Sequence, residues 1–304
     1  MNVLIIGLGS IGKKHVDSLF KIDKDINIYA LRRFENCETY KHVQNITNYL
    51  DIIEIIDFII ISNITSSHFD TILEFSKFKI PLFIEKPLIH ELKGILKLKK
   101  EINEKEIITY VACNLRFHPV INYLQKKILP EITKINEIYV YCGSYLPDWR
   151  PGSDFKNSYS SNKKMGGGVH LDLIHELDYC YWLFGKPEKL NSYKFSKSHL
   201  NLNSIDSVNY LLDYNDFNIK INLNYFRRDS KRYLEILTDN DTIYCDLINN
   251  KISSFSKNYE VKFDKINTYD LQMHYFLDNY ENKYIMNNID EACEVIKLCL
   301  KDES

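Results

Sequence analysis

The sequence predicts an α/β protein of two domains: a Rossmann domain with a doubly wound parallel sheet, then an α/β domain with a mainly antiparallel sheet. Two observations along the chain predict this fold. Residues 3–113 alternate short apolar strands with amphipathic helical segments, the order typical of a parallel sheet with right-handed crossovers. From about residue 134, apolar and polar residues alternate, which indicates strands with one polar face. We therefore expect the first domain over residues 1–118 and the second over residues 119–304.

The expected elements of the first domain follow one another with short connections. Strands are predicted at 3–6, 26–31, 55–62, 82–84 and 107–113, and the helices between them at 11–20, 68–77 and 91–105. The charged run over 97–106 carries both signs at helical spacing. It therefore indicates a solvated helix face and not a binding surface.

The second domain has the period-two alternation of half-buried strands. It is clearest over 217–225, where Ile219, Ile221 and Leu223 alternate with polar residues. Similar strands are predicted at 135–145, 188–197, 206–214, 232–239, 241–248 and 259–263, with turns at 239–241 and 249–250. Helices are expected at 168–184, 269–281 and 289–301.

Composition narrows the functional class. The net charge of −2 arises from intermixed signs over 304 residues, so the sequence indicates no basic surface for nucleic acid. No apolar run approaches the roughly 20 residues that span a bilayer, so we expect no membrane partner and a cytoplasmic protein. The seven cysteines are scattered and contain no Cys-x-x-Cys pair, which disfavours a disulfide framework and a thiolate metal site.

A Gly-x-Gly-x-x-Gly turn directly follows the first strand and opens the first helix. In this context Gly7 permits a tight turn, Gly9 allows the backbone to approach phosphates, and Gly12 allows close packing of helix and strand. The helix N-terminus, beginning at Ser10 and Ile11, supplies oriented N–H donors for a pyrophosphate. The turn therefore predicts a dinucleotide cofactor.

The end of the second strand bears on which dinucleotide is bound. A protein specific for NAD usually has an acidic residue there for the ribose hydroxyls, whereas this chain has Arg32 and Arg33. These residues suit a 2′-phosphate and favour NADP. A contact between Glu35 and the ribose of NAD stays open as the alternative. Asn63, Thr65 and His68 follow the strand at 55–62 and are expected to border the cofactor, although His68 can instead cap or pack its own helix.

Three further motifs follow the glycine turn in order. They are Glu85-Lys86-Pro87, Asn114–Pro119 (NLRFHP) and Gly166–Asp178 (GGGVHLDLIHELD). As an ordered set spanning the chain, they resemble the signatures of the Gfo/Idh/MocA oxidoreductases. The resemblance implies an open antiparallel sheet in the second domain. It also implies NAD(P)-dependent oxidation or reduction of sugars, nucleotide sugars or inositols.

The resemblance also assigns roles to individual residues. It makes Lys86 the family's catalytic lysine, in contact with substrate and cofactor, and His175 the group that accepts or donates the hydroxyl proton. Asp172 lies three residues before His175, on the same face of one helix, where it can orient the histidine. Glu85 is expected beside the cofactor, where it caps or supports the turn that carries Lys86.

Other candidates for substrate contacts have structural alternatives. The irregular segment 146–165 has the length typical of a lid or binding loop. Within it, Trp149 either stacks against a sugar or only packs against the protein. Arg150, Lys163 and Lys164 can bind a carboxylate or phosphate. Arg116 can contact substrate or form a salt bridge between the domains.

Two other functional classes stay open. One is a regulator that senses the dinucleotide without turnover, against which Lys86, Asp172 and His175 argue. The other is a metallohydrolase. Its His-Glu-x-x-His motif could begin at His175-Glu176 but would need a histidine at position 179, where the chain has Tyr179, so no metal is expected. The half-polar sheet suggests a homo-oligomer, a dimer or tetramer, as family members often use this face.

Overall fold

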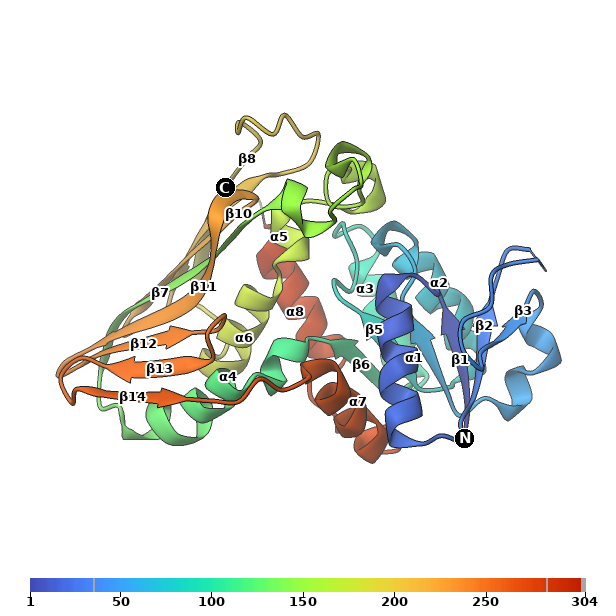
Figure 1. The fold of residues 1–304 in the computed structure, drawn as a ribbon. Coiled ribbons are helices and arrows are strands. Elements are labelled where there is room, and N and C mark those ends of the chain that lie inside the picture. The colour runs from blue at the N-terminus through green and yellow to red at the C-terminus, as the bar shows by residue number, and fades with distance from the viewer. Residues whose placement is uncertain (35, 283, 302–304) are drawn as a thin grey trace. The chain divides into compact units, whose positions relative to one another are not determined.

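The computed structural model describes residues 1–34, 36–282 and 284–301. The chain forms two compact units, shown with their elements in Figure 1. The first contains residues 1–114 and 267–296, and the second contains residues 115–266 and 297–301. None of the helices in these described ranges combines the length and the apolar character needed to cross a membrane.

The first unit is built on a parallel sheet of six strands in the order β3-β2-β1-β4-β5-β6. This is the order of a Rossmann fold and confirms the predicted class. The strands are β1 (Asn2–Ile6), β2 (Asn27–Leu31), β3 (Gln44–Ile46), β4 (Phe58–Ile61), β5 (Leu82–Glu85) and β6 (Thr109–Ala112). β3 was not predicted from the sequence, because three residues are too few to show a period.

The helices of this unit are α1 (Ser10–Ile22), α2 (His68–Phe75), α3 (Ile95–Glu104), α7 (Thr268–Asn279) and most of α8 (Ile289–Leu300). Helix α3 begins later than the expected residue 91, because Gly94 has a φ of 84° and ends the preceding turn. α7 lies beside α1 (Figure 1). The carboxylate of Asp270 there accepts hydrogen bonds from Ser18 at 2.6 Å and Lys21 at 2.8 Å.

The chain returns to the edge of this sheet near residue 287. The N–H of Val111 donates to the Asn287 carbonyl at 2.9 Å, and the Asn287 side-chain amide donates to the Val111 carbonyl at 2.7 Å. The N–H of Ile289 donates to Thr109 at 2.9 Å. The two contacts of Val111 satisfy backbone groups of the edge strand β6 that would otherwise need water or another chain.

The second unit is built on a sheet of eight strands in the order β14-β13-β12-β11-β7-β10-β9-β8. β7 and β10 are parallel and the other neighbouring pairs are antiparallel, which confirms the predicted, mainly antiparallel sheet. The strands are β7 (Ile135–Tyr145), β8 (Lys189–Phe195), β9 (Ser207–Asp213), β10 (Asn218–Asn224), β11 (Phe226–Thr238), β12 (Thr242–Asp246), β13 (Lys251–Ser254) and β14 (Tyr259–Lys262).

The expected alternation places one face of this sheet in the core. On β10, Ile219, Ile221 and Leu223 are buried, whereas Lys220 between them is exposed. The helices of this unit are α4 (Pro119–Tyr123), α5 (Val169–Asp172) and α6 (His175–Phe184). The prediction of one continuous helix over 168–184 is wrong, because Leu173 has φ −101° and ψ 31°, outside the helical region.

Two ion pairs hold helix α6 inside the second unit. Arg116 donates to Asp178 through two nitrogens, at 2.9 and 2.7 Å, and the two side chains are almost fully buried. Glu176 is fully buried and accepts from Arg232 on β11 at 2.6 and 3.0 Å. Removing one partner of such a pair would leave a buried charge uncompensated, at a cost of about 3–5 kcal/mol.

His118 lies in the interior of the same unit. Its Nε2 lies 3.1 Å from the carbonyl oxygen of Leu247, and the residue is 7% exposed. Burial lowers the pKa of His118 from an ordinary 6.5 to about 4, although the Leu247 carbonyl opposes the shift. The folded protein therefore keeps this ring neutral in a pH range where the unfolded chain protonates it.

This shift predicts a loss of stability in mild acid. Because the pKa of His118 is lower in the folded state, its contribution is complete above about pH 6.5 and is lost as pH falls towards 4. The full shift corresponds to roughly 3 kcal/mol. We expect the unfolding free energy of His118→Gln, measured by urea denaturation between pH 7 and 4, to decline less steeply than that of the wild type. Identical slopes for the two proteins would contradict this assignment.

Candidate functional site

The glycine turn after β1 has no room for side chains at two positions. Gly7 has a φ of 98°, and a Cβ atom there would lie 2.4 Å from the backbone nitrogen of Asn63. A Cβ on Gly12 would lie 2.3 Å from the carbonyl oxygen of Gly7. Both glycines are therefore required sterically, since the turn packs directly against the residue after β4 and against the first turn of α1.

Gly9 differs from Gly7 and Gly12, because a Cβ atom on Gly9 would meet nothing within 4 Å. It is the N-cap of α1, and no side chain caps the helix. The N–H groups at the start of this helix, beginning with Ser10 and Ile11, have no acceptor within the helix. With the helix dipole they form a binding position suited to an anion such as a pyrophosphate.

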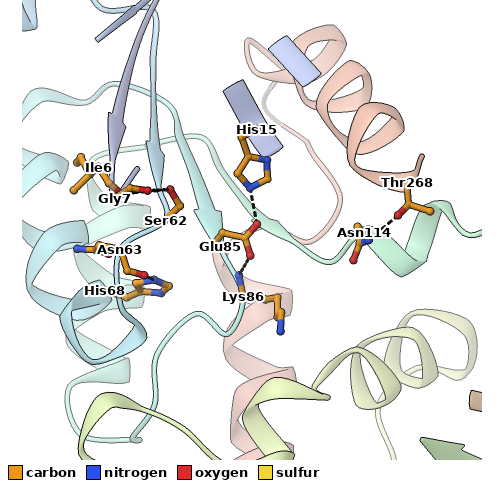
Figure 2. A network of polar contacts seen from close by, with 10 residues as sticks. All are labelled: Ile6, Gly7, His15, Ser62, Asn63, His68, Glu85, Lys86, Asn114 and Thr268. Atoms are coloured by element: carbon orange, nitrogen blue, oxygen red, sulfur yellow. Dashed lines mark hydrogen bonds and ion pairs between the residues drawn. The ribbon is translucent and has the colours of Figure 1, made fainter. Parts of the chain in front are cut away.

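The side chain of Ser62, which follows β4, braces this turn (Figure 2). The hydroxyl of Ser62 donates to the Gly7 carbonyl at 2.8 Å, and the Asn63 amide donates to Thr71 at 2.9 Å. Thr65 is buried in the short turn before α2.

His68 is a buried link between two loops of the first unit. Its Nε2 lies 3.2 Å from the Asn63 carbonyl, and its Nδ1 lies 3.0 Å from the Pro87 carbonyl. Burial lowers the pKa of His68, so the ring is neutral and donates to one carbonyl at a time. The residue thereby ties the end of β4 to the turn that carries Lys86, and a direct contact with cofactor stays a prediction.

A hydrogen-bonded chain runs from α1 to Lys86. Nε2 of His15 lies 2.6 Å from Oε1 of Glu85, and Oε2 of Glu85 accepts from the backbone N–H of Lys86 at 3.1 Å. His15 is fully buried and Glu85 is 7% exposed. Figure 2 shows the Lys86 side chain extending away from the Glu85 carboxylate. Glu85 thus supports the turn after β5, and no local pattern in the sequence predicts His15 as its partner.

The remaining candidates of the first unit lie at its strand ends. Arg32 is half-buried and Arg33 is exposed. A hydrogen bond from Arg32 lowers the pKa of Cys37. Glu35 lies outside the described residues. The Asn114 amide, after β6, donates to Thr268 at 2.6 Å (Figure 2).

In the second unit, Asp172 ends α5 and His175 begins α6. The expectation that both lie on the face of one helix does not apply, because the helix is interrupted between them. Oδ2 of Asp172 accepts a hydrogen bond of 2.5 Å from the hydroxyl of Tyr225, which follows β10. Because 53 residues separate these partners, no local pattern in the sequence predicts this contact.

The segment 146–165 consists of short turns and irregular chain. Trp149 within it is 39% exposed, donates to Ser144 at 2.8 Å, and packs edge-on against Tyr225 with ring centroids 5.4 Å apart. Arg150, Lys163 and Lys164 are exposed. The contacts of Arg116 described above lie inside the second unit, so a contact between Arg116 and substrate stays a prediction.

Each unit therefore gathers part of the predicted set. In the first, the glycine turn, Asn63, His68, Glu85 and Lys86 follow the carboxyl ends of β1, β4 and β5, where ligands bind in doubly wound sheets. In the second, Asp172 and His175 flank a helix break and share the unit with Tyr225. Within residues 1–34, 36–282 and 284–301, no group of three His, Cys, Asp or Glu side chains has an arrangement suited to a metal ion.

Comparison with known proteins supports the family resemblance. Residues 1–113 match the Gfo/Idh/MocA family, described as an oxidoreductase family with an NAD-binding Rossmann fold. Over 195 residues the chain is 26% identical to myo-inositol 2-dehydrogenase from Thermotoga maritima. This match covers 61% of the chain and 55% of the relative, so it spans about half the length of that protein.

Solved structures share the fold over nearly the whole chain. UDP-N-acetylglucosamine 3-dehydrogenase from Acidithiobacillus ferrooxidans has a TM-score of 0.80 at 17% identity, covering 99% of this chain and 95% of that one. Levoglucosan dehydrogenase in complex with NADH has a TM-score of 0.85 at 15% identity, covering 98% and 95%. At these identities the similarity shows the fold alone. The family match covers the first 113 residues, the curated relative matches 61% of the chain, and the shared fold extends over nearly all of it, so these findings together support the predicted resemblance to the Gfo/Idh/MocA family.

Proposed function

We propose that the protein is an NAD(P)-dependent oxidoreductase that transfers a hydride between nicotinamide and a secondary alcohol or ketone of a sugar-type substrate. The observation that carries the proposal lies in the first unit. An uncapped helix N-terminus suited to pyrophosphate and the lysine of the Glu-Lys-Pro turn follow the carboxyl ends of strands in one parallel sheet. A dinucleotide and an ionisable group are the two requirements for this chemistry.

The first unit's residues hold the cofactor in this proposal. The N–H groups of Ser10, Ile11 and Gly12 bind the pyrophosphate, and Gly9 leaves room for it. Asn63, Thr65 and His68 border the cofactor. Gly7 fixes the turn. When bound, the dinucleotide supplies or accepts the hydride.

The chain's own residues handle the proton. Oxidation of a hydroxyl group is assisted by a group that removes its proton, and reduction of the ketone by one that returns it. We assign this proton transfer to His175, which Asp172 orients, and to Lys86, whose ammonium group stabilises the developing negative charge on the reacting oxygen. Glu85 holds the backbone of Lys86 in place.

The relatives and the residues of the second unit support a proposed substrate class. The relatives act, by their names, on myo-inositol, a nucleotide sugar and levoglucosan, so we propose a sugar, nucleotide sugar or inositol. Trp149 offers a partly exposed ring for stacking, and Arg150 offers a charge for an anionic substituent. The scattered free cysteines suit a reducing compartment, so the proposal places the enzyme in the cytoplasm.

The first test replaces the two residues to which we assign proton transfer and stabilisation of the negative charge. We expect Lys86→Met and His175→Ala each to lower kcat roughly 100-fold or more, with little change in the Kd for the dinucleotide. Turnover is followed by the absorbance of reduced nicotinamide with a panel of inositols, sugars and nucleotide sugars. Lys24→Met removes an exposed lysine from the same unit and serves as the matched control, with kcat unchanged.

Two outcomes would contradict this assignment. If the Lys86→Met protein kept most of the wild-type kcat, Lys86 would have no part in the reaction. A wild-type protein that binds NAD(P)H tightly but turns over none of the panel would favour the alternative, a regulator that senses the dinucleotide.

The second test concerns the dinucleotide. We propose that NADP(H) binds at least as tightly as NAD(H), because Arg32 and Arg33 follow β2 where the ribose phosphate is expected. Replacing both with alanine should weaken NADP(H) binding about tenfold or more and leave NAD(H) binding nearly unchanged. The Kd values are measured by nicotinamide fluorescence. Equal wild-type affinities that the double substitution does not alter would refute the preference.

We also propose that the protein is a homo-oligomer, a dimer or tetramer, assembled through the outer face of the eight-stranded sheet. This face carries stacked Tyr141 and Tyr233 with ring centroids 5.5 Å apart, and Tyr244 beside Tyr233 at 5.3 Å. Leu211 and Tyr193, on the same face of β9 and β8, are 39% and 49% exposed. Aromatic residues are enriched in such interfaces.

Charge introduced on this face should therefore dissociate the oligomer. We expect size-exclusion chromatography with light scattering to show a dimer or tetramer for the wild type and a monomer for Leu211→Lys with Tyr233→Lys. Phe255→Lys changes an 83% exposed residue in the turn after β13 and should leave the oligomer intact. A monomeric wild type, or an oligomer that survives the double substitution, would rule out this interface.

A further inference from the structure

We propose that Tyr225 is a positioning residue for the reaction, which holds the carboxylate of Asp172 in place through its hydroxyl group. The inference rests on the proposed function, in which Asp172 orients His175. In this role Tyr225 acts through Asp172.

The contact between the two residues is short and partly buried. The Tyr225 hydroxyl donates to Oδ2 of Asp172 at 2.5 Å, and Tyr225 is fully buried. Hydrogen bonds from a hydroxyl to a carboxylate span about 2.5–2.7 Å and are stronger than bonds between neutral groups. The contact fixes one carboxylate oxygen of Asp172.

The backbone and ring of Tyr225 are themselves held from several sides. Its N–H donates to the Asp206 carbonyl at 3.0 Å, and its carbonyl accepts from the N–H of Leu146 at 2.8 Å. The edge of Trp149 packs on its ring, with centroids 5.4 Å apart. The backbone hydrogen bonds and the packing against Trp149 hold the Tyr225 hydroxyl within a narrow range of positions. A positioning group requires this restriction.

The hydroxyl also keeps its proton. Burial, together with the negative charge of Asp172, raises the pKa of Tyr225 well above its usual value. The residue therefore remains a donor through the neutral and alkaline pH range of an enzyme assay, and Asp172 accepts the same hydrogen bond throughout.

A second tyrosine in the same unit provides a matched control. Tyr210 on β9 is also buried, and its hydroxyl donates to the backbone carbonyl of Cys299 at 3.0 Å. Tyr210→Phe removes a buried hydrogen bond of similar kind without touching Asp172. Comparing it with Tyr225→Phe separates a general loss of stability from an effect on the reaction.

The experiment measures kcat, KM and the Kd for the dinucleotide for the wild type, Tyr225→Phe, Tyr210→Phe, Asp172→Asn and the double variant Tyr225→Phe/Asp172→Asn. Rates are normalised to the folded fraction, measured by near-ultraviolet circular dichroism. We expect Tyr225→Phe to lower kcat about tenfold with the dinucleotide Kd unchanged, and Tyr210→Phe to stay within about twofold of the wild type. Added to Asp172→Asn, Tyr225→Phe should lower kcat by less than about twofold more, because its partner is already lost.

Three results would overturn the inference. Tyr225→Phe could retain wild-type kcat while Asp172→Asn loses it, in which case the proposed function stands and Tyr225 has no part in it. The losses could multiply in the double variant, so that Tyr225 would act independently of Asp172. If Asp172→Asn itself kept the wild-type kcat, the role of Asp172 in the proposed function would fail and the inference with it.

Discussion

The close approach of three backbone segments at the end of β1 is the constraint on which the first unit depends. Gly7 leaves no room for a Cβ beside Asn63, and Gly12 leaves none beside the Gly7 carbonyl. This packing brings the start of α1 directly over the end of the parallel sheet, with its N–H groups unpaired within the helix. The same turn is braced by Ser62, and His68 links its neighbour Asn63 to Pro87. A side chain at either glycine would separate the helix N-terminus from the strand ends that follow it.

The residues proposed to act in the reaction follow or adjoin residues that are held by buried polar contacts. Lys86 follows Glu85, whose carboxylate lies against His15 and accepts the Lys86 N–H. His175 begins the helix in which Glu176 and Asp178 are paired with Arg232 and Arg116. Buried ion pairs contribute little net stability compared with apolar packing, but breaking one is costly, so each strongly favours a single position of its chain segment. The buried contacts of neighbouring residues therefore fix the backbone positions from which Lys86 and His175 extend.

The sequence predicted the parts of this structure that depend on local pattern. Apolar strands, the glycine turn and the period-two alternation of β10 led to one parallel and one mainly antiparallel sheet, both of which the structure contains. The ordered motifs led to the family whose model matches residues 1–113. It did not predict β3, which is too short to show a period, or the break at Leu173, where every residue is compatible with helix. The contacts His15–Glu85 and Asp172–Tyr225 join residues 70 and 53 positions apart, and such pairing is decided by packing. The return of residues 267–296 to the first unit likewise depends on contacts such as Asn287–Val111.

The central claim is that the N-terminus of α1 binds the pyrophosphate of a nicotinamide dinucleotide. The most direct measurement is a crystal structure of the protein with NADP⁺ or NAD⁺ at saturating concentration. The account predicts pyrophosphate oxygens within about 3.2 Å of the backbone N–H groups of Ser10 and Ile11, with Gly9 alongside. A dinucleotide bound away from the Gly7–Gly12 turn, or no dinucleotide bound at saturation, would contradict it.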